Sequence, residues 1–147
     1  MNKKYLRFIR TCILSAISML IIGAVAAFLT SKLTNSKYII AIASTLAGYI
    51  GMYSVFFPLQ AHDNPDLYRS KGKFKWNVFI TDQAKIVFGF AILDIAYLLG
   101  KPILVTLFLE HGISPVNSSL YSDFIFYFVL AISTWPIAKL SGALRKK

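Results

Sequence analysis

The stretch IVFGFAILDIAYLLGKPILVTLFL, residues 86–109, decides the fold because it has a membrane-spanning length and yet carries residues that membrane helices seldom contain. About 20 mostly apolar residues are enough for a helix to cross a bilayer. Inside this stretch lie Asp94, Lys101 and Pro102. A charge near the centre of a membrane helix costs about 2.5–3.5 kcal/mol. We therefore expect other helices to enclose this span.

The two charges of this span lie on nearly the same face of a helix, because Asp94 and Lys101 are seven residues apart. The opposite face carries Gly89, Ala96 and Gly100, small residues that let another helix approach closely. Two interpretations stay open for the charges. They pair and lock the helices together, or they contact a substrate or an ion. Pro102 removes a helix hydrogen bond and predicts a kink beside them.

The composition indicates a polytopic membrane protein of one domain. The chain has 147 residues, of which 56% are hydrophobic, and its mean hydropathy is +0.61. The net charge of +10 does not point to nucleic acid, because the basic residues flank apolar spans instead of forming one stripe. Cys12 is the single cysteine and lies in an apolar run, which excludes an intrachain disulfide and predicts a packing role. We expect no metal and no cofactor.

Four apolar segments predict an all-α fold of two transmembrane hairpins within a single domain, residues 1–147. The expected spans are about 11–30, 38–59, 86–109 and 115–140, and the loop 60–85 joins the hairpins. Thirteen of the sixteen Lys and Arg residues fall on one side of this arrangement. Because basic residues favour the cytoplasmic side, both termini are predicted to be cytoplasmic. The expected location is the cell (plasma) membrane, as an integral multi-pass protein.

The same topology predicts an ion pair between Lys101 and Asp123. Lys101 lies eight residues before the turn between the last two spans, and Asp123 eight residues after the start of the fourth, so antiparallel helices bring them to similar depth. Asp94 then lies about two turns deeper without an evident partner, as expected of a proton carrier or cation ligand. The predicted intramembrane polar pocket contains Asp94, Lys101, Asp123, Tyr97 and Tyr127.

The second expected span carries a stripe of small residues that predicts a close contact with another helix. The opposite side of this span carries Tyr49 and Tyr53. The small residues of the stripe are Ala41, Ser44, Ala47, Gly48 and Gly51.

The loop 60–85 combines basic residues with Phe74 and Trp76. Such a mixture occurs in proteins that bind single-stranded nucleic acid, but it is also typical of a segment at the membrane surface. We favour the membrane surface, with lysines facing anionic lipid. The predicted belt for lipid headgroups or phosphate consists of Arg7, Arg10, Lys71, Lys73 and Lys85.

The chain resembles the GtrA-like family of small four-helix membrane proteins over almost its full length. The resemblance rests on the two-hairpin layout, on KYLRF at residues 4–8 and on FAILD at residues 90–94. The second and fourth spans end in VFFPL (55–59) and STWPIAKL (133–140), without the Asn-Arg signature of that family, so no binding residue is assigned from it. The resemblance implies a role with polyprenyl-phosphate-linked sugars in cell-surface glycan assembly.

Three functional classes follow. The first is a membrane translocator or accessory protein for polyprenyl-phosphate-linked sugars. The second is a small proton- or cation-coupled transporter, and the third is a non-catalytic structural subunit of a larger membrane complex. An enzyme is not expected, because the sequence has no acidic cluster for metal–phosphate chemistry and no nucleophile beside a base. The expected partners are membrane lipids, the sugar carriers, and a second copy or another membrane protein.

Overall fold

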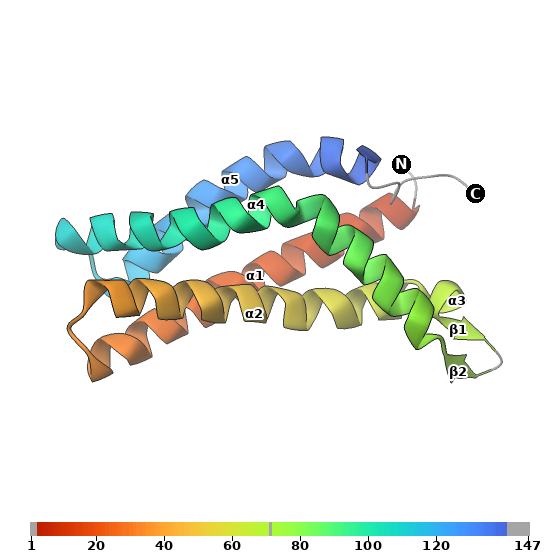
Figure 1. Ribbon diagram of the computed structural model, residues 1–147, viewed down its shortest axis with the longest axis horizontal. Coiled ribbons are helices and arrows are strands. Elements are labelled where there is room, and N and C mark those ends of the chain that lie inside the picture. The colour runs from red at the N-terminus through yellow and green to blue at the C-terminus, as the bar shows by residue number, and fades with distance from the viewer. Residues whose placement is uncertain (1–2, 71, 141–147) are drawn as a thin grey trace.

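Four long helices make up most of the computed structural model, which describes residues 3–70 and 72–140. They form two hairpins, and a small cap of one short helix and two short strands lies between the hairpins in the chain (Figure 1). The predicted all-α fold is therefore confirmed for the described residues. The elements are α1 (Lys3–Leu33), α2 (Lys37–Asp63), α3 (Pro65–Tyr68), β1 (Arg69–Ser70), β2 (Lys73–Phe74), α4 (Trp76–Glu110) and α5 (Pro115–Leu140).

Three of these helices, α1, α2 and α4, are long and apolar enough to cross a membrane. α4 is 35 residues long, which corresponds to about 52 Å, against about 30 Å for the hydrocarbon core of a bilayer. The helix begins at Trp76 and not at residue 86, and α2 continues to Asp63, so the expected loop 60–85 is wrong in extent. Hydropathy marks where the apolar part of a helix begins, and residues 76–85 contain no Gly or Pro that would end the helix there.

The first hairpin packs through the small residues of α2. A Cβ atom on Gly51 would lie 2.6 Å from Cδ1 of Ile22, and one on Gly48 would lie 3.2 Å from the Met19 carbonyl oxygen. Ala41 and Ser44 on the same stripe are buried. The predicted close contact is therefore confirmed, and the neighbour is α1.

The two hairpins join in a ring of four helices. α1 contacts α2 and α5, and α4 contacts α2 and α5 (Figure 1). Gly100 lies against α5, since a Cβ atom there would be 2.6 Å from Cζ of Phe126. Gly89 and Ala96 are exposed, so the close approach of another helix at these two residues stays a prediction.

α4 is not straight, but Pro102 does not end it. The helix runs through Pro102 without interruption. Its main bend lies in the green part of Figure 1, which the colour bar places before residue 100. Membrane helices tolerate proline where neighbouring groups compensate for the missing hydrogen bond.

Candidate functional site

A cavity of about 420 Å³ lies between α1, α2 and α4, and α5 adds Tyr127 to its wall. Its size is within the range of small-molecule sites. Apolar and aromatic side chains form most of the lining, and Asp94 is the one charged lining residue in the described part of the chain. The aromatic lining residues are Tyr49, Tyr53, Phe56, Phe90, Tyr97 and Tyr127.

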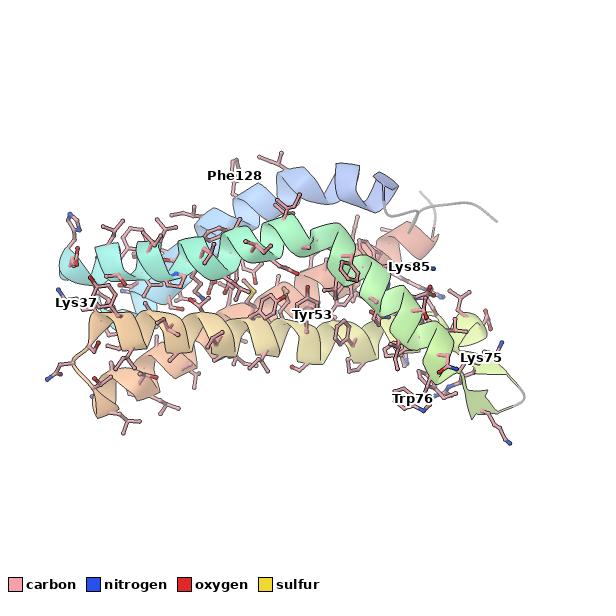
Figure 2. All side chains as sticks on the ribbon, viewed as in Figure 1. Lys37, Tyr53, Lys75, Trp76, Lys85 and Phe128 are labelled. Carbon is pink, nitrogen blue, oxygen red and sulfur yellow. The ribbon has the colours of Figure 1, made fainter. Side chains whose placement is uncertain are left out.

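Two tyrosines of α2 hold the carboxylate of Asp94. The hydroxyl of Tyr53 donates a hydrogen bond of 2.7 Å to Oδ2 of Asp94, and the hydroxyl of Tyr49 donates one of 3.2 Å to the same oxygen. Figure 2 shows Tyr53 on the side of α2 that faces α4. Asp94 therefore has no ion-pair partner among the described residues, as expected, but the α2 face opposite the small-residue stripe supplies two hydrogen-bond donors. Tyr49 and Tyr53 are four residues apart, which places both hydroxyls on one face of α2, but the sequence does not say which helix that face meets.

The predicted ion pair between Lys101 and Asp123 is confirmed. Nζ of Lys101 lies 2.7 Å from Oδ1 of Asp123, and neither side chain has any exposed surface. Tyr97 joins the pair: its hydroxyl accepts a 3.0 Å hydrogen bond from Lys101 and donates one of 3.0 Å to Asp123. Because buried charges must be paired and hydrogen-bonded, this trio fixes the register of α4 against α5.

The ammonium group of Lys101 also approaches Gly23 of α1. A Cβ atom on Gly23 would lie 3.2 Å from Nζ of Lys101, 3.2 Å from the Ser44 carbonyl oxygen and 3.4 Å from Oγ of Ser119. Oγ of Ser119 and Oδ2 of Asp123 are buried and have no hydrogen-bond partner among the described residues. Sequence reasoning missed Gly23 and Ser119, although the i, i+4 spacing of Ser119 and Asp123 placed both on one face of α5.

The predicted polar pocket is thus two neighbouring sites. Asp94, Tyr97 and Tyr127 line the cavity, whereas Lys101 and Asp123 do not reach it. Tyr97 belongs to both sites, since it lines the cavity and contacts the ion pair. The hydroxyl of Tyr127 donates to the Ala16 carbonyl oxygen on α1. A binding role for these five residues stays a prediction.

The predicted basic belt is partly engaged within the chain. Asp63, at the end of α2, forms an ion pair with Arg10 and accepts a 3.2 Å hydrogen bond from the hydroxyl of Thr11, while Arg7 donates to its carbonyl oxygen at 3.1 Å. Nζ of Lys85 lies 3.6 Å from Oδ1 of Asp82. Lys73 is exposed on β2, and Lys71 lies outside the described residues. The belt as a headgroup site stays a prediction.

Four aromatic side chains of the cap and of the first turn of α4 form a cluster. The ring of Tyr68 packs edge-on against Phe79 with 5.2 Å between centroids, and Phe74 packs against Trp76 at 4.7 Å. Burial and the neighbouring carboxylate of Asp82 raise the pKa of Tyr68 to about 12. Trp76 keeps 64% of its surface exposed, and Figure 2 shows it beside Lys75 at the start of α4.

Comparison with family models, with curated proteins and with solved structures finds no match to the chain. The resemblance to GtrA-like proteins therefore stays a prediction, and the case for function is built from the site itself.

Proposed function

We propose that the chain is a translocator or accessory protein for polyprenyl-phosphate-linked sugars, with the Asp94 cavity as the site of the sugar. The observation that carries this proposal is a cavity of about 420 Å³ inside a helical bundle, with one carboxylate and several phenol hydroxyls on largely apolar walls. A few convergent polar groups in an apolar pocket are typical of ligand sites. Sugar hydroxyls donate to a carboxylate, and the apolar faces of a sugar ring pack on aromatic rings.

The proposed topology has four spans and cytoplasmic termini, in the cell membrane. α5 is the proposed fourth span: it is 26 residues long, contacts α4 and α1, and follows α4 after a short turn at Gly112. The distribution of basic residues supports the orientation, because the cap before α4 and both chain ends are basic while the opposite turns contain only Lys32 and Lys37.

The phosphate of such a carrier fits the cytoplasmic edge better than the cavity. An anionic phosphate beside Asp94 would be repelled, whereas Arg7, Lys73 and Lys85 are exposed at the end of the bundle where α4 begins. The proposed arrangement has the phosphate in this basic belt, the sugar in the cavity and the polyprenyl chain in the lipid.

A proton- or cation-coupled transporter is the second candidate. The observation that favours it is that Asp94 has no cationic partner among the described residues, because its hydrogen bonds come from two neutral phenols.

A third class is a non-catalytic subunit of a membrane complex. It is favoured by the exposed small residues Gly89 and Ala96 on α4, where a second copy or another membrane protein can approach closely.

Reconstitution tests the proposal. Liposomes that contain the protein and a fluorescent polyprenyl-phosphate-linked sugar are treated with a membrane-impermeant reagent that destroys the dye. We expect the protein to increase the fraction of lipid that reaches the outer leaflet, and Asp94→Asn to abolish the increase. Asp66→Asn, an exposed acid outside the cavity, is the matched control. The second candidate would be favoured if the protein neither bound nor moved the carrier. It would also have to support a proton-dependent uptake that Asp94→Asn removes.

A further inference from the structure

The cavity contains one carboxyl group, that of Asp94, which forms no ion pair with a basic side chain among the described residues. Asp94 is its charged lining residue, and among the described residues Asp94 accepts hydrogen bonds from two neutral tyrosines, both at Oδ2. Lys101, on the same helix, is already paired with Asp123 at 2.7 Å and does not line the cavity. A carboxylate between largely apolar walls gains most from a ligand of opposite charge, because electrostatic attraction is stronger beside apolar groups than in bulk water.

The geometry of the carboxylate leaves one oxygen for a ligand. Tyr49 and Tyr53 occupy Oδ2, and no hydrogen bond to Oδ1 is found among the described residues. The two tyrosines also fix the orientation of the group. A protonated amine that enters the cavity can therefore donate to Oδ1 without displacing either phenol.

The aromatic side chains that line the cavity suit a cation, as the carboxyl group of Asp94 does. Six aromatic rings line the space, and the face of an aromatic ring carries partial negative charge that attracts ammonium groups. Tyr49 and Tyr53 lie with their ring centroids 5.0 Å apart, and Tyr49 stacks on Tyr97 at 6.4 Å, so rings of α2 and α4 adjoin at Asp94. Met19 and Met52 add polarisable sulfur to the lining. Aromatic walls around an ammonium group are a recurrent recognition mode.

We propose that the Asp94 cavity selects an organic cation, with a protonated amine or quaternary ammonium against Asp94 and its apolar part against the aromatic walls. The inference rests on the proposed role of the cavity as a ligand site and names the class of ligand. If the ligand is a lipid-linked sugar, we expect the sugar to carry an amine. If the ligand is a free substrate, we expect an amphipathic ammonium compound.

A pair of isosteric probes tests the charge preference on the unmodified protein. Benzyltrimethylammonium and neopentylbenzene have the same shape and differ in charge. Binding to the protein in nanodiscs is measured by saturation-transfer NMR, with empty nanodiscs to correct for partition into lipid. We expect the ammonium probe to bind at least tenfold more tightly than its neutral isostere. Equal affinity, or tighter binding of the neutral probe, would overturn the proposal without the need for any variant.

Variants then locate the site. Asp94→Asn is expected to weaken binding of the ammonium probe at least tenfold and to leave binding of the neutral probe unchanged, while Asp66→Asn changes neither. Folding of each variant is checked by its thermal unfolding. If Asp94→Asn binds the ammonium probe as the parent does, the cation site is elsewhere and the proposal fails.

The two proposals fail in different ways. Transfer of a neutral lipid-linked sugar in liposomes, with no preference for an amine-bearing one and no binding of the ammonium probe, would reject the cation inference and leave the proposed function intact. Selective binding of the ammonium probe at Asp94, with no effect of the protein on any lipid-linked sugar, would reject the carrier function and leave the cation site.

Discussion

Lys101 of α4 and Asp123 of α5 form an ion pair of 2.7 Å in which neither side chain is exposed, and the hydroxyl of Tyr97 is hydrogen-bonded to both. The pair joins two helices that are neighbours in the chain. A register shift of either helix by one residue would leave two buried charges without partners, which is far more costly than the loss of an apolar contact. The pair therefore specifies how α4 and α5 align.

Removing one partner of this pair should destabilise the protein strongly. Lys101→Met leaves Asp123 charged and buried, and Asp123→Leu does the same to Lys101, so each single variant should lose about 3–5 kcal/mol of unfolding free energy. The double variant Lys101→Met/Asp123→Leu should recover most of this loss, because no uncompensated charge remains. The free energy of unfolding in mixed detergent micelles is measured for the parent, the two single variants and the double variant. Additive losses in the double variant would contradict the prediction.

Gly23 should tolerate no side chain, because Lys101 Nζ and the Ser44 carbonyl oxygen each lie 3.2 Å from the position of its missing Cβ. A methyl group there presses on the ion pair and on the backbone of α2. Gly23→Ala should therefore lower the free energy of unfolding by about 1–3 kcal/mol. Gly89→Ala is the control, since Gly89 is exposed on α4 and alanine favours a helix. Equal stability of the two variants would argue against close contact at Gly23.

Asp63 should hold the start of α1 and the end of α2 together. Its carboxylate contacts Arg10 and the buried hydroxyl of Thr11. Asp63→Asn removes the charge, so this end of the hairpin should open more often. Cys12, the next residue after Thr11 and the single cysteine of the chain, reports the opening as faster reaction with a thiol reagent. Asp66→Asn is the control and should leave the reaction rate of Cys12 unchanged. If Asp63→Asn also left this rate unchanged, the contacts of Asp63 with Arg10 and Thr11 would not hold the hairpin together.

The ion pair was predictable from the sequence, and the partners of Asp94 were not. Lys101 and Asp123 are related by depth alone, because a short turn makes α4 and α5 antiparallel neighbours. The partners of Asp94 depend on which helix faces it, and neither periodicity nor hydropathy specifies that α2 lies beside α4. Gly23 was missed for a similar reason: its importance comes from atoms of α2, α4 and α5 that meet around it.

The start of α4 shows a different limit. Hydropathy located the apolar residues from 86 onward, but the helix continues outward to Trp76. A helix boundary is set by capping and by breaking residues, whereas a hydropathy boundary is set by the solvent. The two coincide only where capping or breaking residues fall at the edge of the apolar stretch, and α4 begins ten residues before that edge.

Trp76 should lie at the level of the lipid headgroups. It is 64% exposed, packs on Phe74 and lies beside exposed basic residues, as amphipathic aromatics do at membrane interfaces. The chain has two tryptophans, so Trp135→Phe leaves Trp76 as the single tryptophan, whose emission is excited apart from that of the tyrosines. Lipids brominated near the headgroup should then quench its emission more than lipids brominated at the chain ends. Stronger quenching from the chain ends would contradict this position.

The charge of the cap should make this contact depend on anionic lipid. Lys73→Gln/Lys75→Gln in the same single-tryptophan background should reduce the quenching by brominated anionic lipid and leave that by brominated zwitterionic lipid unchanged, because the lysines attract the anionic headgroups. The same charge change at the other end of the bundle, Lys32→Gln/Lys37→Gln, is the matched control and should have no effect. Salt should weaken the preference for anionic lipid in the parent, since charges near the membrane surface are screened within about 10 Å at 0.1 M ionic strength. A preference that survives both the lysine substitutions and high salt would show that Trp76 is held by the packing of the cap alone.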